Sequence, residues 1–458
     1  MFSLEIKFKD SLRKFKFTPV QIVVIGFALT ILIGALILKL PISAVDGKST
    51  PFIDCLFTAT SAVCVTGLVT VDTGTHWTYF GKTVIMMLIQ IGGLGFMSFA
   101  TLVSLIIGKK ITLRERLVMQ ESLNYNSLQG LVKLVKYILV FTFSAEFAGA
   151  ALFATQFIPD FGIGKGLYYS MFHAVSFFCN AGFDVMGDFK SLTEYYNNSV
   201  VILTTSSLIA IGGLGFIVWD EIYHYKKIKR FSLHSKVVIS MTAILIVTGA
   251  VLFFIFEYTN PDTMQPMSLK GKVLSSILAS ITPRTAGVNS INLSAMTSAS
   301  ILLTIILMFI GGSPGSTAGG IKTSTFGILL MTMVSVIRGR EDTEYFKRRV
   351  SKDIVYKALA VTIIGLGIVI TVTMILSFTE RGSGMPFEYY IYEATSGFGT
   401  VGLSLGLTQK LTTFGKALIA LTMYAGRVGP LTIAVALTIR KHDKGNSIRY
   451  PEDKILVG

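Results

Sequence analysis

The sequence predicts an all-α integral membrane protein in which eight spanning helices form four tandem repeats. Three observations support this fold class: an apolar composition, an alternation of basic segments along the chain, and a loop pattern that recurs four times. Of the 458 residues, 52% are hydrophobic and only 15% are charged, and the mean hydropathy is +0.65. Soluble domains average about 25% charged residues, so this composition indicates a membrane protein.

Eight apolar runs are long enough to cross about 30 Å of hydrocarbon at about 1.5 Å per residue. They lie near residues 20–40, 84–107, 134–158, 200–218, 237–256, 300–337, 355–378 and 415–439. The first run is too long for a signal peptide, and no small-residue cleavage site follows it. We therefore expect eight spanning helices.

Basic residues are concentrated in segments that alternate with loops poor in Lys and Arg. Five segments, 1–18, 109–136, 226–236, 338–357 and 440–458, contain 28 of the 41 Lys and Arg residues. The bias of basic residues toward the cytoplasm explains this alternation and places both termini there. It also accounts for the net charge of +15 without a nucleic-acid partner. Lys347, Arg348 and Arg349 are interpreted in the same way, with anionic membrane lipid or an acidic partner as the alternatives.

Four loops share one frame, with Ala at the third position and Gly at the eleventh. They are FTATSAVCVTGL (57–68), FHAVSFFCNAGF (172–183), ILASITPRTAGV (277–288) and YEATSGFGTVGL (392–403). Successive frame glycines are 115, 105 and 115 residues apart. An apolar run precedes each loop and another follows it, which predicts a unit of helix, short re-entrant helix, extended loop and helix.

These units divide the chain into four pore repeats with basic ends. The predicted boundaries are 1–18 for an N-terminal cytoplasmic segment, 19–110, 111–230, 231–350 and 351–440 for the repeats, and 441–458 for a cytoplasmic tail. A glycine pair follows the frame glycine in three repeats, at Gly92-Gly93, Gly212-Gly213 and Gly311-Gly312, and the fourth repeat has Ala425-Gly426. The third loop has Ile281 where the other three have Ser.

A lone glycine in an apolar loop is usually a turn residue, but four at one frame position indicate a shared role. Non-helical backbone at membrane depth is tolerated only where protein buries it or where it lines a water-filled cavity. Four such loops around a pseudo-four-fold pore axis can point carbonyls inward and replace the hydration shell of a cation. The predicted ion-binding residues are Val65, Thr66, Gly67, Asn180, Ala181, Gly182, Thr285, Ala286, Gly287, Thr400, Val401 and Gly402.

The stretch MFIGGSPGSTAGGIK (308–322) interrupts the sixth apolar run. As one helix this run would be about 60 Å long, and Gly311 would lie about 21 Å from its outer end. A polar loop at that depth cannot face lipid, so we expect it to cross the pore beneath the filter as a gate. The predicted gate residues are Gly311, Gly312, Ser313, Pro314, Gly315, Ser316, Thr317, Ala318, Gly319, Gly320, Lys322 and Arg427. The alternative is a rigid kink that only packs helices.

Buried charges belong to the same region. Arg427 lies at mid-span, where a charge is costly and usually functional. It can pair with carbonyls of the gate loop, or form a buried salt bridge with Glu146 or Glu393. Lys322 can place a charge in the pore or extend to the cytoplasmic surface. Arg284, directly before the third filter loop, is expected to brace that loop.

The four-fold pattern, the filter loops and the GGSPGSTAGGIKT stretch resemble the Trk/Ktr/HKT potassium transporter superfamily, most closely its bacterial KtrB branch. The resemblance covers about Thr18 to Arg440. It implies potassium uptake in the bacterial plasma membrane, with potassium as substrate, sodium as a candidate activating ion and no cofactor on this chain. It also implies a homodimer on a cytosolic KtrA-like ring of nucleotide-binding subunits. Gly67 stands where the plant sodium branch has Ser.

Two other functions are considered. A sodium-coupled transporter with alternating access usually has inverted repeats and membrane-buried acids, whereas these repeats are parallel and only Glu146 is clearly intramembrane. Gly311 to Gly315 fits the G-x-S-x-G pattern of hydrolases, but an apolar helical run rather than a strand precedes Ser313. No nucleotide-binding fingerprint occurs, and three cysteines suggest neither a disulfide framework nor a metal site. The chain is therefore not expected to be an enzyme.

Overall fold

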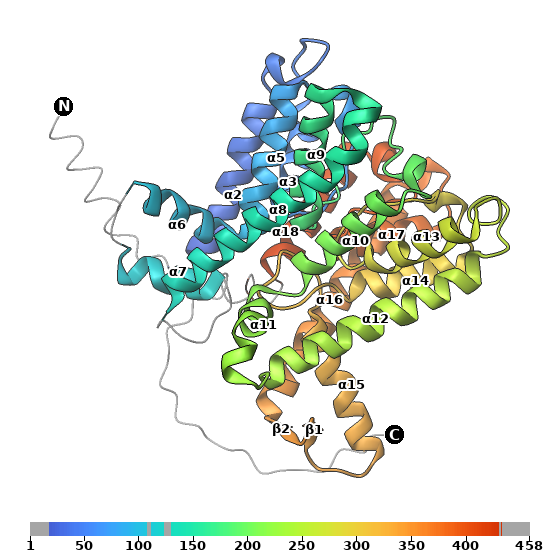
Figure 1. Cartoon of the computed structure of the whole chain (residues 1–458). Coiled ribbons are helices and arrows are strands. Elements are labelled where there is room, and N and C mark those ends of the chain that lie inside the picture. Colours follow the sequence, from blue (N-terminus) through green and yellow to red (C-terminus); the bar gives the residue numbers. More distant parts are fainter. Residues whose placement is uncertain (1–17, 108–110, 123–129, 430–431, 433–458) are drawn as a thin grey trace.

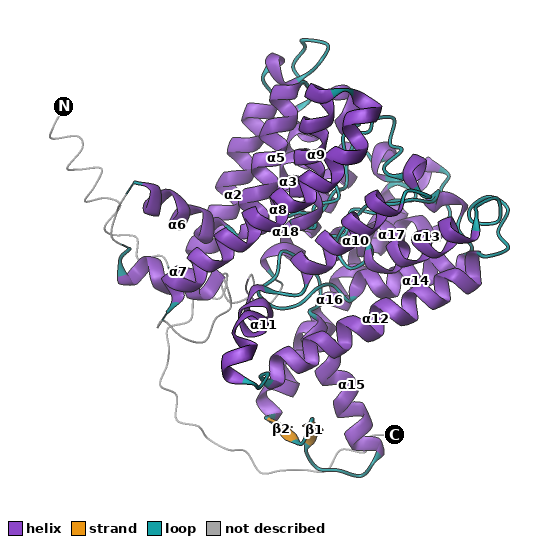
Figure 2. Cartoon of the chain, viewed as in Figure 1, coloured by secondary structure: helices purple, strands orange, loops and turns teal. Residues whose placement is uncertain are grey.

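The computed structural model describes residues 18–107, 111–122, 130–429 and 432, which form a helical protein with one small hairpin (Figures 1 and 2). The predicted basic ends therefore lie outside the described residues, except for Thr18. Strands β1 (Thr343–Tyr345) and β2 (Arg348–Val350) pair antiparallel, with Thr343 opposite Val350. This hairpin is an addition to the all-α fold that the sequence predicts.

The helices follow one order four times, and we call each set a unit. The first unit contains α2 (Pro19–Leu38), α3 (Phe52–Val63), α4 (Thr73–His76), α5 (Tyr79–Leu94) and α6 (Phe96–Ile106), and α7 (Leu113–Ser122) follows it. The second contains α8 (Leu131–Phe161), α9 (Ile163–Phe178), α10 (Ser199–Gly213) and α11 (Phe216–Ile228). The third contains α12 (Leu233–Glu257), α13 (Leu269–Ile281), α14 (Ser298–Phe309) and α15 (Thr323–Ile337). The fourth contains α16 (Lys352–Thr379), α17 (Phe387–Gly399) and α18 (Thr413–Val428). Short 3-10 turns lie at Pro41–Ser43, Thr193–Tyr195, Leu293–Ala295, Arg381–Ser383 and Thr408–Lys410.

Four unbroken helices, α2, α8, α12 and α16, are long and apolar enough to cross a membrane. In their most apolar windows only 28–33% of the residues are buried inside the protein. The rest of each window is apolar surface, as expected for helices that face hydrocarbon. The capping box at Thr18 and Gln21, followed by Pro19, fixes the start of α2.

The second apolar runs of the first three units are not continuous helices. Gly95 ends α5 and Gly215 begins α11, with φ values of 80° and 91°, which suit glycine, and Gly429 ends α18 with a φ of 94°. The axis turns by 94° between α10 and α11. In the third unit the interruption is longer, because α14 ends at Phe309 and α15 begins at Thr323. The break in the third unit was predicted from the sequence, whereas hydropathy did not reveal those at Gly95 and Gly215, since a single glycine does not interrupt an apolar run.

Each second helix starts at a polar N-cap that also contacts the end of the first helix of its unit. Thr78 donates to the carbonyl of Ile42 at 2.8 Å, and Asn198 donates to Gln156 at 2.9 Å. Thr297 donates to Glu257 at 2.8 Å, and Thr412 donates to Glu380 at 2.6 Å. All four side chains accept backbone N–H bonds in the first turn of the helix that follows. One cap therefore starts a helix and fixes its position against another.

The units pack in a closed circle. The second helix of each unit packs against the short helix of the next, in the pairs α5 with α9, α10 with α13, and α14 with α17. The circle closes because α18 packs against α3. The Tyr424 hydroxyl in α18 also donates to the carbonyl of Val24 in α2, at 2.6 Å. The first and last parts of the chain are therefore neighbours, and the loops after the four short helices meet at the centre.

Candidate functional site

The four frame glycines lie next to one another in a closed ring. A methyl group built on Gly67 would lie 2.5 Å from the carbonyl oxygen of Ala181 and 3.0 Å from the Cα of Gly182. The same group on Gly182 would lie 2.5 Å from the carbonyl of Ala286, and on Gly287 2.5 Å from that of Val401. A methyl group on Gly402 would collide with the carbonyl of Thr66. Since Thr66 belongs to the first loop, the fourth loop contacts the first and the ring is closed. Each loop leaves no room for a side chain on its neighbour, so glycine is required four times.

The backbone of these loops is left-handed at every second residue. The frame glycines have φ values of 95°, 68°, 74° and 94° at positions 67, 182, 287 and 402. Two residues earlier, Val65, Asn180, Thr285 and Thr400 have φ values of 57°, 60°, 77° and 51°. Positive φ is unfavourable for Val and Thr, and such outliers concentrate at functional sites. The four loops therefore share one unusual backbone pattern, with left-handed residues at the frame glycine and two positions before it.

Hydroxyl groups at the ends of the short helices hold the loops in place. Ser61 accepts the N–H of Gly67 at 3.0 Å, and Ser396 accepts that of Gly402 at 3.2 Å. In the third loop, Thr282 accepts the N–H of Val288 at 2.8 Å. The third loop has Ile281 where the other loops have Ser, but it still has a supporting hydroxyl, because the next residue, Thr282, supplies one. In the second loop, Ser176 donates to the carbonyl of Phe183 at 2.6 Å.

His173 and Arg284 lie behind the ring. His173 is fully buried within α9, not in the loop itself, where its Nδ1 faces the carbonyl of Tyr169 at 2.7 Å and its Nε2 accepts the N–H of Val185 at 3.4 Å. Arg284 is buried and donates to Thr242 of α12 at 3.3 Å. Arg284 therefore points toward α12, whereas His173 holds the chain that follows the second frame glycine.

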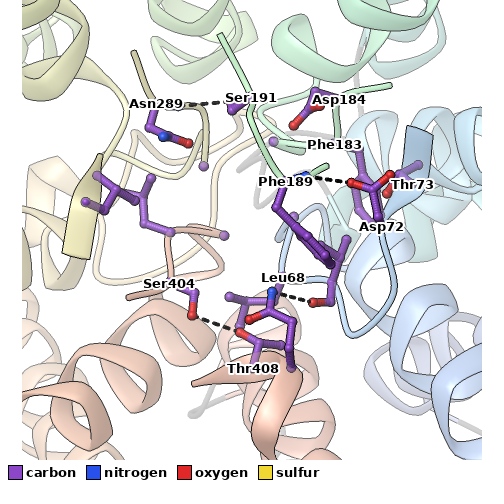
Figure 3. Close-up of a pocket in the computed structure, with 18 residues that line it drawn as sticks. Leu68, Asp72, Thr73, Phe183, Asp184, Phe189, Ser191, Asn289, Ser404 and Thr408 are labelled. Atoms are coloured by element: carbon purple, nitrogen blue, oxygen red, sulfur yellow. Dashed lines mark hydrogen bonds between the residues drawn. The ribbon is translucent and has the colours of Figure 1, made fainter. Parts of the chain in front are cut away.

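A cavity of about 120 Å³ opens on the side where the loops leave the ring, and we call it the vestibule. All four frame glycines line it, and segments from the four units surround it (Figure 3). Its remaining lining carries two carboxylates, Asp72 and Asp184, and no Lys or Arg among the described residues. The pKa of Asp184 is raised to about 7, mainly by burial and also by the charge of Asp72, although the N–H of Met186 favours the ionised form. The vestibule therefore attracts cations.

Residues 310–321 form a loop that is closed at its base. Ile310 and Ile321 pair as a parallel bridge, and the N–H of Gly311 donates to the carbonyl of Ile321 at 2.8 Å. The tip binds α10, because the N–H of Ser313 donates to the carbonyl of Gly213 at 3.0 Å. The hydroxyl of Ser313 lies 3.1 Å from that of Thr323, and no histidine of the described residues bonds to it, so the part of the chain described here gives Ser313 no general base.

This loop lies under the ring, on the side opposite the vestibule. A methyl group on Gly319 would collide with the hydroxyl of Thr400, and Gly320 lies against Gly399. The hydroxyl of Thr317 donates to the carbonyl of Phe178 at 3.3 Å. Phe178, Gly399 and Thr400 come before the frame glycines, whereas the vestibule residues come after them. The predicted gate residues of this loop therefore lie next to the residues that precede the frame glycines.

Arg427 connects this loop to the first unit. Its guanidinium donates to the carbonyl of Thr317 in the loop and to the carbonyl of Gly92 in α5. Lys322 donates to the carbonyl of Ala318 at 2.7 Å. The salt bridge with Glu146 or Glu393 is wrong, because those side chains bond elsewhere. Glu146 accepts from Cys179 at 3.8 Å, and Glu393 accepts from Ser404 at 2.8 Å and from Thr408.

The position of Arg427 also corrects the alignment of the fourth unit. Gly92, Gly212 and Gly426 each lie against a carbonyl at the end of a short helix, namely those of Val63, Phe178 and Phe398. Gly426 therefore corresponds to the first glycine of the pair, and Ala425 does not belong to it. Arg427 then occupies the place of Gly93 and Gly213, which explains how its side chain reaches the carbonyls under the ring.

Asp72, Asp184 and Phe189, which line the vestibule from loops beyond the frame glycines, are not among the residues predicted from the sequence. Asp72 caps α4 by accepting the N–H of Thr75 at 2.7 Å and also holds the N–H of Phe189 at 2.8 Å. Asp184 could have been found from the sequence, because it is the first charged residue after the frame glycine Gly182. The contact between Asp72 and Phe189 could not, because no sequence pattern links two residues 117 positions apart.

Comparison with known proteins identifies the family of this chain. A family model described as TrkH, cation transport protein, matches residues 5–450. The potassium/sodium uptake protein NtpJ of Enterococcus hirae is 45% identical over 98% of this chain and 99% of its own length. The Ktr system potassium uptake protein B of Bacillus subtilis is 44% identical, and the match covers 98% of this chain and 99% of that protein. The protein of the same name from Vibrio alginolyticus is 38% identical, and the match covers 96% of this chain and 94% of that protein.

The fold has a solved counterpart. The crystal structure of the potassium transporter TrkH from Vibrio parahaemolyticus superposes with a TM-score of 0.70 at 16% identity, and the match covers 92% of this chain and 84% of that one. The family match across nearly the whole chain confirms the resemblance noted from the sequence. The chain belongs to the TrkH family of cation transport proteins, which are membrane transporters and not enzymes.

Proposed function

We propose that this chain conducts potassium ions across the bacterial plasma membrane through the ring of filter loops, as the membrane subunit of a Ktr-type uptake system. The closed ring of frame glycines carries the proposal, because it brings carbonyls from four loops to one axis. The names of the relatives, which describe potassium uptake, support potassium as the substrate. The filter residues are the twelve predicted from the sequence, from Val65 to Gly67 and at the three equivalent positions.

In this proposal the four repeats have the predicted boundaries, the chain crosses the membrane eight times, and both termini are cytoplasmic. The vestibule then faces outward, and the gate loop and the hairpin face inward. Cysteine labelling from one side tests this topology. Substitutions near residues 75, 190 and 408 are expected to react from outside, and those near 122, 230 and 345 from inside. Reaction of both sets from one side would contradict the four-repeat arrangement.

Residues 311–320 act as the gate in this proposal, with Arg427 holding the loop closed beneath the ring. The two carbonyl contacts of Arg427 connect the loop to α5, and both must break if the loop leaves the axis. Charged donors make hydrogen bonds that are about twice as strong as neutral ones, which suits a latch. The loop has no bulky side chain, so a small displacement opens the path.

The proposed assembly is a homodimer on a cytosolic KtrA-like ring of nucleotide-binding subunits. The name of the Bacillus subtilis relative, which places it in a Ktr system, supports partners of this kind. Sodium is the candidate activating ion, and the potassium/sodium name of the Enterococcus hirae relative makes it the first ion to examine. That name also supports the rival function, sodium-coupled transport with alternating access.

Flux through purified protein in liposomes tests the conduction proposal. Gly67→Ser puts a side chain into the ring, where the neighbouring carbonyl lies 2.5 Å from the added Cβ. We expect its preference for potassium over sodium to fall, while Gly47→Ser, on an open loop with nothing within 4 Å, leaves it unchanged. Unchanged selectivity in Gly67→Ser would contradict the filter. Strict stoichiometric coupling to sodium, with turnover no faster than domain motions, would instead support alternating access.

A further inference from the structure

A second cavity lies beside the vestibule and has no part in the proposed pathway. Its volume is about 460 Å³, which is within the range of small-molecule sites. It lies between the outer loops of the second and third units. Phe189 and Asn289 line both cavities, so they form the partition between this side cavity and the vestibule.

The partition is held in a strained conformation. Gly187, Asp188, Phe189 and Ser191 all have left-handed backbone, with φ values of 93°, 56°, 53° and 51°. Asp72 fixes one side of this segment through the N–H of Phe189 at 2.8 Å. On the other side, the N–H of Leu192 donates to the carbonyl of Asn289 at 3.0 Å. Strain of this kind persists only where the surroundings impose it, and it often marks a ligand site.

The lining of the side cavity favours a cation. Asp188 and Asp262 contribute two carboxylates, and both residues are exposed. The only described lysine in the lining, Lys190, forms its shorter ion pair with Glu194 at 3.1 Å and lies 4.0 Å from Asp188, so Asp262 is the carboxylate of the lining that is not shared with Lys190. Tyr196 and Phe189 contribute aromatic rings, and the Phe189 side chain is 49% exposed. Carboxylates together with aromatic faces are the usual recognition elements for an ammonium group.

We propose that the side cavity binds a small organic cation of the quaternary ammonium class, and that its occupancy lowers potassium entry. The bound charge lies directly behind Phe189, so it repels potassium from the vestibule. This predicts a change in the potassium concentration at half-maximal uptake more than in the maximal rate. The binding step itself does not depend on the conduction proposal, and direct binding and flux are therefore measured separately.

The probe is choline, and its neutral isostere 3,3-dimethyl-1-butanol is the first control. Titration calorimetry on the purified full chain is expected to give saturable choline binding in the millimolar range, which is ordinary for so few atoms. Asp262→Asn and Tyr196→Leu, which do not line the vestibule, are expected to weaken binding at least fivefold. Tyr196→Phe keeps the aromatic face and should retain it. Asp46→Asn, an exposed acid on the same face, should behave as the parent.

Flux provides the second measurement. Choline on the vestibule side, at the concentration that half-saturates the parent in calorimetry, is expected to raise the half-maximal potassium concentration of the parent two- to threefold and to raise that of Asp262→Asn clearly less. Equal binding of the neutral isostere, absence of saturable binding, or equal inhibition of the parent and of both Asp262→Asn and Tyr196→Leu would overturn the proposal. If choline inhibits the parent and both variants equally although the variants no longer bind it in calorimetry, choline acts in the vestibule and the proposal is wrong. If a variant elutes or melts differently from the parent and is therefore misfolded, choline binding is compared between Tyr196→Phe and Tyr196→Ile instead. Equal binding by these two variants would overturn the proposal.

Discussion

Asp54 and Lys416 are 362 residues apart and form an ion pair of 2.7 Å between α3 and α18. Their side chains are only 11% and 17% exposed. The pair lies where the last unit meets the first, so it joins the two ends of the circle of helices. Removing one partner leaves the other charge buried without compensation.

Lys416→Met is therefore expected to destabilise the protein by about 3–5 kcal/mol, the usual cost of an orphaned buried charge. Lys190→Met is the matched control, because its ion pair with Glu194 has side chains 50% and 69% exposed, and solvent screening leaves such a pair little effect on stability. Melting of the detergent-solubilised protein measures both. If Asp54→Asn combined with Lys416→Met is no more stable than Lys416→Met alone, the orphaned charge is not the cause.

Thr282→Val should loosen the third filter loop. It leaves the N–H of Val288 without its acceptor at 2.8 Å, which costs about 1–3 kcal/mol in a buried site. We expect lower preference for potassium over sodium in liposome flux, with rescue by Thr282→Ser. Thr248→Val, whose hydroxyl bonds the carbonyl of Ile244 on an exposed face of α12, should leave selectivity unchanged. Normal selectivity in Thr282→Val would show that the hydroxyl is dispensable.

Shortening the loop between Gly312 and Gly319 should raise potassium flux while ion preference is kept, because the filter loops stay intact. Arg427→Ala is the milder form of the same test. It removes donors to Thr317 and Gly92, and hydrogen bonds to charged groups contribute about 1.5–3 kcal/mol each. At least tenfold higher basal flux is expected if these bonds stabilise a closed state. A folded deletion variant with flux equal to or below that of the parent would favour the packing kink.

Uptake should depend on pH on the vestibule side. Asp184 has a pKa raised to about 7, so it is largely neutral at pH 6 and largely ionised at pH 8. The negative charge that attracts cations is therefore present above pH 7 and is lost as the pH falls. At subsaturating potassium, uptake is expected to increase from pH 6 to pH 8, and Asp184→Asn should flatten this profile. Asp46→Asn, an exposed acid outside the vestibule, should retain it, and a retained slope in Asp184→Asn would assign the effect to another group.

Three features could be predicted from the sequence because each is unusual in an apolar helical chain. They are the recurring frame glycines, the run of small and helix-breaking residues at 311–320, and the charged Arg427 within an apolar segment. Thr282 was missed because the third loop moves its hydroxyl by one residue relative to the frame. The breaks at Gly95 and Gly215 were missed because an apolar window does not register a change in φ.

The vestibule could not be predicted, because its walls come from loops that meet only after the circle has closed. Asp72 and Phe189 are 117 residues apart, and neither lies in a recurring pattern. The same holds for the partition formed by Phe189 and Asn289. Features imposed by repetition were therefore accessible from the sequence, whereas features imposed by contact between unlike loops were not.

The ring of frame glycines is built from a single chain, and this has a consequence for how it can diverge. In a ring of four identical subunits, one codon change alters every quarter at once, and any defect is multiplied by four. Here Gly67→Ser changes one quarter and leaves Gly182, Gly287 and Gly402 as they are. Ion preference can therefore drift in small inherited steps, each survivable, and the four quarters are free to specialise.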